Sequence, residues 1–191
     1  DILPDLRALT AAVHAGGAAI SAQITHGGSF VTGMKVKGRT ISSSGGFNPA
    51  GMLKGNFLQR AMNAADMERV TAEFVAAARL AREAGFDAVE LHMGHGYLLN
   101  QFISPLSNRR QDEYGGSPEN RVRFPARVLA AVKQAVGDTT AVLAKINVAD
   151  GTRRGASVED AATLGVGQPP LRVFQHGHQA CDPVDAAPDE R

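Results

Sequence analysis

The sequence predicts an α/β protein that forms part of a (β/α)8 TIM barrel. Segments of strand and helix character alternate along most of the chain, which is typical of parallel strands joined by right-handed crossovers. Polar clusters follow the predicted strands at their carboxyl ends, where barrel enzymes form their sites. A complete barrel needs eight strands and about 250 residues. About three βα units can be counted in these 191 residues, so we expect a partial barrel.

The first third of the chain predicts a helix, a strand and a long loop. Residues 6–15 have a helical pattern that ends at two glycines. Residues 18–25 then form an apolar strand interrupted by one amide, Gln23. Residues 28–64 are rich in glycine and serine and show no period. A loop of that length inside a compact domain is usually functional or disordered.

The middle of the chain predicts a helix, a strand and a second loop. Apolar residues at helical spacing begin after Asp66, which we take as the N-cap, and Gly85 lies just past the helix end. Residues 87–92 form a short predicted strand, and residues 95–117 are expected to be the loop after it. The helix would therefore connect two parallel strands.

A further helix and strand follow the second loop. Ser117 is followed by proline and glutamate, which together favour a helix start through the cap, the fixed φ and the helix dipole. This helix is expected to run to Gly137. Residues 140–148 form a third apolar strand, and residues 157–160 look like the start of one more helix.

The predicted domain organisation divides the chain at residue 162. Residues 1–162 are expected to form the partial barrel domain, and residues 163–191 a divergent, disordered tail of irregular structure. The tail is rich in proline and has neither a helical nor a strand period. It holds Cys181, the single cysteine, so the chain cannot form an internal disulfide. Because the first residue is Asp1 and not methionine, we expect a truncated product.

The overall composition excludes several classes of function. There are 20 basic and 19 acidic side chains, and the formal net charge is +1. Nucleic acids and anionic membranes need clustered cationic surface, so neither is a predicted partner. No apolar stretch approaches the length of a membrane span and no secretion signal begins the chain, so the predicted location is cytoplasmic. The expected partner is a small molecule, no metal site is predicted, and the oligomeric state stays open.

Three proton-carrying rings gather after the second predicted strand. His92 and His95 are three residues apart, and Tyr97 lies two further on. Two imidazoles can donate hydrogen bonds to one oxygen and stabilise the negative charge that develops there, and tyrosine can act as a general acid. The alternative is a strand-end histidine, a surface histidine and a core tyrosine. Their occurrence together at a strand's carboxyl end favours a site for reducing an activated double bond.

Residues 90–124, ELHMGHGYLLNQFISPLSNRRQDEYGGSPENRVRF, resemble the signature of the old yellow enzyme family of FMN-dependent oxidoreductases. NADH:flavin oxidoreductases and 2,4-dienoyl-CoA reductases belong to this family. The resemblance extends over about residues 5–160. It implies a β/α barrel with FMN across the carboxyl ends of the strands and NAD(P)H as the reductant.

The resemblance also assigns roles at the substrate side. His92 and His95 match the pair that binds the oxygen of the substrate's activating group, and many relatives have asparagine at the second position. Tyr97 matches the tyrosine that protonates the carbon next to that group. The charged residues of segment 108–113, with Asn120 and Arg121, match as well, but they are better explained as a network that fixes the loop.

Three further residues match cofactor-binding positions. Gln23 matches the glutamine that binds the pyrimidine edge of the flavin, although a core hydrogen bond is a simpler alternative. Lys145 matches the cation against the flavin's N1 and O2 edge, although a surface lysine is possible there. His26 matches a histidine common in the family's QxxHxG segment, with a weaker case for direct contact.

The predicted function is therefore that of an ene reductase or NAD(P)H:flavin oxidoreductase. Hydride would pass from NAD(P)H through FMN to the activated alkene of an unsaturated carbonyl compound. The alternative is a truncated, catalytically inactive barrel fragment that binds no flavin alone, because the strands expected to hold the FMN phosphate are not found. The physiological substrate and the choice between NADH and NADPH stay open.

Overall fold

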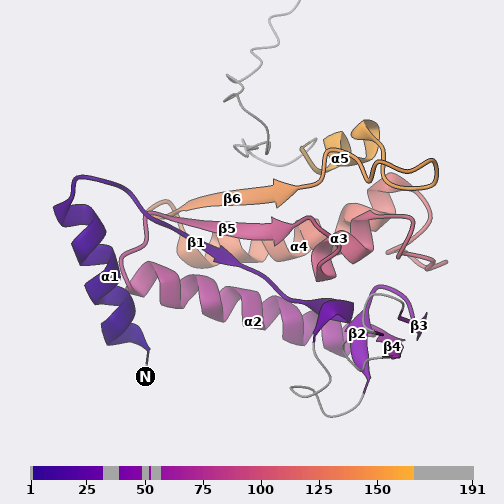
Figure 1. The fold of residues 1–191 in the computed structure, drawn as a ribbon, viewed down its shortest axis with the longest axis horizontal. Helices are drawn as coiled ribbons and strands as arrows, with labels where there is room; N and C mark the ends of the chain where they lie inside the picture. Colours follow the sequence, from indigo (N-terminus) through magenta and orange to yellow (C-terminus); the bar gives the residue numbers. More distant parts are fainter. Residues whose placement is uncertain (1, 32–38, 49–51, 53–56, 166–191) are drawn as a thin grey trace, which may run out of the picture.

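The protein's structure, a computed structural model, describes residues 2–31, 39–48, 52 and 57–165. Its main sheet contains three parallel strands in the spatial order β1, β5, β6 (Figure 1). These strands are β1 (Ser21–Ile24), β5 (Ala88–Met93) and β6 (Ala141–Ile146). The helices are α1 (Leu3–Ala15), α2 (Ala64–Glu83), α3 (Leu98–Ile103), α4 (Pro118–Val136) and α5 (Val158–Gly165). Parallel strands joined by helices confirm the predicted partial barrel.

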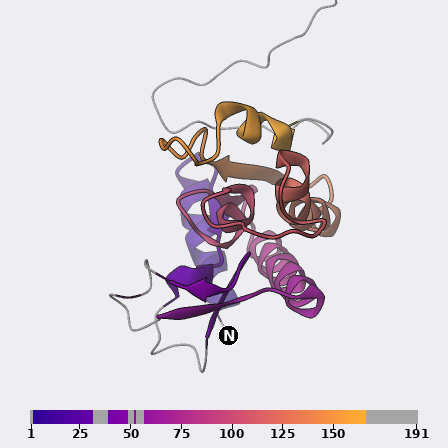
Figure 2. The ribbon, with the colours of Figure 1, turned by 90° about the vertical axis from the view of Figure 1, so that its right-hand side faces the viewer.

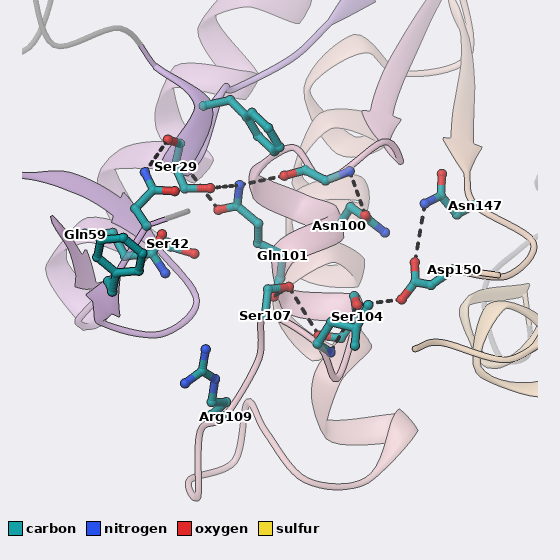
Figure 3. Close-up of a pocket in the computed structure, with 15 residues that line it drawn as sticks. Ser29, Ser42, Gln59, Asn100, Gln101, Ser104, Ser107, Arg109, Asn147 and Asp150 are labelled. Atoms are coloured by element: carbon teal, nitrogen blue, oxygen red, sulfur yellow. Dashed lines mark hydrogen bonds between the residues drawn. The ribbon is translucent and has the colours of Figure 1, made fainter. Parts of the chain in front are cut away.

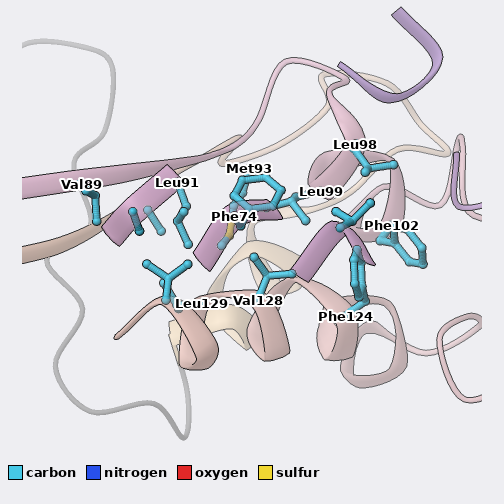
Figure 4. Packing of buried hydrophobic residues seen from close by; sticks show 14 of the residues in the cluster. Phe74, Val89, Leu91, Met93, Leu98, Leu99, Phe102, Phe124, Val128 and Leu129 are labelled. Carbon is cyan, nitrogen blue, oxygen red and sulfur yellow. The ribbon is translucent and has the colours of Figure 1, made fainter. Parts of the chain in front are cut away.

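The hydrophobic core lies between the main sheet and helices α2, α3 and α4 (Figure 4). Val89, Leu91 and Met93 alternate along β5 and have no exposed surface. Phe74 of α2 and Phe124 of α4 pack in the same cluster. We call the face of the sheet that carries these apolar residues the outer face. The opposite, inner face carries the intervening residues of each strand.

The N-cap of helix α2 lies three residues before the predicted one. Asn63 is the N-cap, and its side-chain oxygen accepts a hydrogen bond from the Asp66 amide at 2.9 Å. The Asp66 carboxylate in turn accepts from the Asn63 amide at 2.9 Å. The prediction of Asp66 as the N-cap was therefore wrong. Asn63 and Asp66 form a capping box, and because the side chains of both residue types can cap a helix, the sequence pattern did not distinguish the N-cap from the N3 residue. The predicted cap of α4 is confirmed, since the Ser117 hydroxyl accepts from the Asn120 amide.

The segment predicted as one long loop, residues 28–64, contains regular structure. It holds a 3-10 turn, η1 (Gly28–Phe30), and a small sheet in the order β2, β4, β3. The strands are β2 (Thr40–Ser42), β3 (Gly46–Phe47) and β4 (Leu58–Ala61). Arg110 donates to the backbone carbonyls of Ser43 and Met62 at 2.9 and 2.8 Å, which ties β2 and β4 to a distant loop. Contacts between residues so far apart in the chain produce no periodic sequence pattern from which the small sheet could be predicted.

The second predicted loop, residues 95–117, also contains a helix. All six residues of α3 are buried. A helix that is buried on every side lacks the polar face that makes an amphipathic pattern visible. Figure 2 looks onto the carboxyl ends of the main sheet and shows α3 between the small sheet and α5.

The carboxyl-terminal prediction is only partly within the described residues. Ser157 begins α5 as expected, because its amide donates to Asp160 at 2.9 Å and its hydroxyl accepts from the Asp160 amide. The helix runs to Gly165, just past the predicted boundary at residue 162. The rest of the predicted tail, residues 166–191, lies outside the described residues. Of the helices that are described, none has the length and apolar character needed to cross a membrane.

Candidate active site

Four polar residues share the inner face of the main sheet, and three of them were predicted as site residues. Gln23 of β1 is in register with Glu90 of β5, and His92 of β5 is in register with Lys145 of β6. Register partners in a parallel sheet project to the same face, as do residues two apart on one strand. These four side chains therefore lie on the face opposite the core, towards the carboxyl ends of the strands.

Gln23 and Glu90 are hydrogen-bonded to each other. The Gln23 amide nitrogen donates to one Glu90 carboxylate oxygen. Gln23 is exposed, so the alternative of a buried core amide does not describe its environment. Because a carboxylate can only accept, the contact orients the amide and leaves its carbonyl oxygen available to another donor.

The three rings predicted to form the chemical centre do lie together. The His92 ring centroid is 4.9 Å from that of His95 and 5.0 Å from that of Tyr97. Both contacts are edge-on. His92 is buried, whereas His95 is exposed. The Tyr97 ring also packs edge-on against Phe30 at 5.8 Å, which restricts its orientation.

The pKa of the His92 imidazole is lowered, which favours the neutral form of the ring. Burial lowers its pKa below the usual value of 6.5, and electrostatic interactions with His95 and Lys145 lower it further, while Glu90 and a hydrogen bond with the Lys145 backbone oppose the shift. The Gly94 amide donates to Nδ1 at 3.4 Å. A neutral imidazole whose Nδ1 accepts a hydrogen bond carries its proton on Nε2.

The turn that carries His95 is fixed by three amide side chains. His95 has φ 55°, in the left-handed region, and its amide donates to Asn147 Oδ1 at 2.9 Å. The Gly96 amide donates to Asn100 Oδ1 at 2.8 Å, and the Gly96 carbonyl accepts from Gln101 at 2.6 Å. Histidine and asparagine are both enriched at positive φ. This backbone conformation explains why either residue suits the position.

Lys145 is a half-buried cation on the inner face. Within the described part of the chain its ammonium group has no ion pair or hydrogen bond. A partly buried charge without a partner is unfavourable, so it suits an anionic or electron-rich ligand. This environment differs from that of a surface lysine.

His26 is less clearly part of this arrangement. Its Nδ1 accepts from the Gly28 amide at 3.0 Å, and burial lowers its pKa. The charges that influence it most belong to Glu73 and Arg69 of α2, which covers the outer face. Its cofactor role stays a prediction.

The predicted loop network is confirmed. Asn108 donates to the carbonyls of Phe102 and Tyr114, both at 2.7 Å. Arg110 pairs with Asp112 at 2.5 Å. Arg121 is buried and reaches three different elements. These charges stabilise the loop between α3 and α4.

A pocket of about 360 Å³ lies over α3, between the small sheet and the end of β6 (Figure 3). Most of the residues that line it have polar side chains, among them Ser29, Gln59, Asn100, Arg109, Asn147 and Asp150. Gly96, in the His95 turn, also lines it, but the predicted catalytic rings do not. Sequence reasoning missed this pocket because most of the residues that line it belong to segments predicted as loops.

Other residues of the site were not given a role from the sequence. Glu90 and Asn147 lie two residues from His92 and Lys145, so the period of two along each strand was the available signal. Asn100 and Gln101 gave no such signal, because α3 was not predicted. Among the described residues there is no cluster of three or more metal-ligating side chains.

Comparison with known proteins identifies relatives of the whole described fold. The model of the NADH:flavin oxidoreductase / NADH oxidase family matches residues 1–178. A 4,4'-dithiodibutanoate disulfide reductase from Rhodococcus erythropolis is 44% identical over 164 residues, covering 85% of this chain and 39% of the relative. An NADPH dehydrogenase from Geobacillus thermodenitrificans is 41% identical over 161 residues, covering 84% of this chain and 44% of the relative.

Solved structures agree with these sequence matches. Old Yellow Enzyme from Pichia sp. AKU4542 superposes with a TM-score of 0.73 at 31% identity, covering 85% of this chain and 45% of that one. Morphinone reductase in complex with tetrahydroNAD gives a TM-score of 0.71 at 27% identity, covering 84% and 48%. The chain thus spans less than half the length of these relatives.

Proposed function

Because this chain belongs to the NADH:flavin oxidoreductase / NADH oxidase family, we propose that it supplies the inner-face wall of an FMN site in an NAD(P)H-dependent ene reductase. The substrate class we propose is an unsaturated carbonyl compound. The observation that supports this most is the contact of His92 with the His95 and Tyr97 rings beside Lys145. Relatives named NADPH dehydrogenase support the reductant.

The inner-face residues fit the polar edge of a flavin. That edge presents both carbonyl oxygens and an N–H group, and it becomes more negative on reduction. Lys145 offers a cation without a partner in the described residues, and Gln23 offers a carbonyl oriented by Glu90. When bound, FMN would take hydride from NAD(P)H and supply it to the alkene. His26 would be a further contact, on the evidence of family resemblance alone.

His92 and His95 would hold the substrate. Both imidazoles can donate a hydrogen bond to one carbonyl oxygen, and negative charge grows on that oxygen as the alkene is reduced. The lowered pKa of His92 keeps it neutral, so its contribution is a directed N–H group and not a fixed positive charge. The edge-on contact with His95 places the second donor next to the first.

Tyr97 would complete the reaction as the general acid. Its phenol would give a proton to the carbon next to the carbonyl group while hydride adds at the other alkene carbon. The contacts of its ring with His92 and Phe30 fix the direction of the hydroxyl before the substrate binds. Proton transfer then needs no large reorientation of the side chain.

The test is to measure the two half-reactions of the flavin-loaded protein in the Tyr97→Phe variant. General acids typically contribute a factor of about 10²–10⁴, so alkene reduction should slow by about that factor. Flavin reduction by NAD(P)H should be unchanged. Tyr114→Phe is the matched control, because Tyr114 is the other tyrosine and lies in the loop network. Equal loss of both half-reactions in Tyr97→Phe would count against the assignment.

A further inference from the structure

We propose that Asn147 is a positioning residue that fixes the second substrate-binding imidazole, His95. His95 is the one non-glycine residue with positive φ among those described, and such a backbone needs external support. The support comes from the next strand, because the His95 amide donates to Asn147 Oδ1 at 2.9 Å. The effect on catalysis rests on the proposed role of His95 in binding substrate. The hydrogen bond itself does not depend on that role.

The orientation of the Asn147 amide is determined by its two partners. Its nitrogen, Nδ2, lies 3.5 Å from Asp150 Oδ1, at the long limit for a hydrogen bond. A carboxylate can only accept and a peptide N–H can only donate, so one orientation of the amide satisfies both contacts. That orientation directs Oδ1 towards the His95 turn.

Asp150 is itself held in place on its other side. Its Oδ2 accepts from the Ser104 hydroxyl at 2.5 Å and from the Ala156 amide at 2.7 Å. Figure 3 shows the contacts of Asp150 with Asn147 and Ser104 across the pocket. Asp150 therefore joins α3 and the segment after β6 to the residue that supports His95.

The close approach of Asn147 to the turn also needs a glycine at position 94. A Cβ atom there would lie 2.8 Å from Asn147 Oδ1, closer than side chains tolerate. Asn147 follows Lys145 by two residues, just past the end of β6. The end of β6 would thus have two roles: Lys145 would contact the flavin, and Asn147 would hold the His95 ring in position relative to His92.

The first test measures the hydrogen bond without flavin or substrate. In protein labelled with 15N-histidine, the His95 amide should exchange with solvent about five- to tenfold faster in Asn147→Ala than in the wild type, as expected for loss of one ordinary hydrogen bond. Asn120→Ala is the matched control, because the Asn120 side chain accepts from Arg123 in α4 and has no contact with the His95 turn. Unchanged exchange of His95 in Asn147→Ala would overturn the proposal.

A second variant covers the case in which Asn147→Ala does not fold. Gly94→Ala keeps the amide but displaces its oxygen, so the same increase in His95 exchange is expected. If the exchange of His95 does not rise in Gly94→Ala, the proposed contact is wrong.

The functional test is a double-mutant cycle in the flavin-loaded protein, with cyclohex-2-enone as the probe. Asn147→Ala should lower kcat/KM about five- to tenfold. In a His95→Gly background, which removes the ring and tolerates positive φ, the same change should have less than about a twofold effect. Additive effects would overturn the positioning role. If no variant, including the wild type, reduces the enone, the proposed function fails while the exchange result still decides the contact.

Discussion

Replacing Arg121 should destabilise the protein more than replacing any exposed arginine. Arg121 is 6% exposed and uses all three of its guanidinium nitrogens. Nε donates to the Ile103 carbonyl at 2.8 Å, Nη1 to the Gly116 carbonyl at 2.5 Å, and Nη2 to Asp160 at 2.6 Å. One side chain therefore connects α3, the loop after it and α5.

The expected magnitude follows from what Arg121→Met leaves behind. Methionine keeps much of the apolar stem but leaves a largely buried Asp160 carboxylate and two backbone carbonyls without their donor. Removing one partner of a buried ion pair typically costs about 3–5 kcal/mol. Because the second Asp160 oxygen still accepts from the Ser157 amide, we expect the lower end of that range, about 3 kcal/mol.

The assay is urea unfolding followed by far-UV circular dichroism, with Arg127→Met as the control. Arg127 pairs with Glu68 at 2.7 Å, but the two side chains are 37% and 73% exposed. Exposed pairs contribute about 0–1 kcal/mol. If the two variants differ by less than about 1 kcal/mol, this buried network does not fix the loop.

Two further predictions concern backbone and charge. His95→Asn should unfold at nearly the wild-type temperature, whereas His95→Val should lose about 1–3 kcal/mol, because a β-branched residue is strained at φ 55°; thermal melts of both variants compare them directly. The hydrogen bond from Arg60 lowers the pKa of Asp66 from 3.8 to about 2. Its stabilisation is therefore complete above pH 4 and is lost as the pH falls towards 2. Because Arg60 is half exposed, solvent screens the pair and we expect about 1–2 kcal/mol. The stability difference between wild type and Asp66→Asn should shrink over that range, and a constant difference would contradict the assignment.

The fold class could be predicted because its signals are local. Strand and helix periods, the Ser117 cap and the glycines after α2 and α4 each depend on a few neighbouring residues. The small sheet and α3 depend instead on contacts between distant segments, such as Ser43 with the Gln101 carbonyl at 2.6 Å. A single sequence contains no period that reports such contacts.

The candidate site also contains residues that are close in the sequence and residues that only the fold brings together. His92, His95 and Tyr97 lie within six positions, so their proximity could be read from the sequence. The contact of His95 with Asn147 joins residues 52 positions apart. The Gln23 and Glu90 contact depends on strand register, which becomes known only when the sheet is assembled. The strand period could point to these residues, but their contacts were visible only in the structure.

The proposed function requires that the inner face of the sheet binds a flavin. The most direct measurement is a titration of FMN with the purified chain, followed by flavin fluorescence. We predict saturable quenching, with an affinity about tenfold lower in Lys145→Met, as for loss of one charge-assisted contact. It should be unchanged in Lys133→Met, which alters an exposed lysine of α4. Absence of quenching would contradict the claim and favour the alternative that this chain binds no flavin alone.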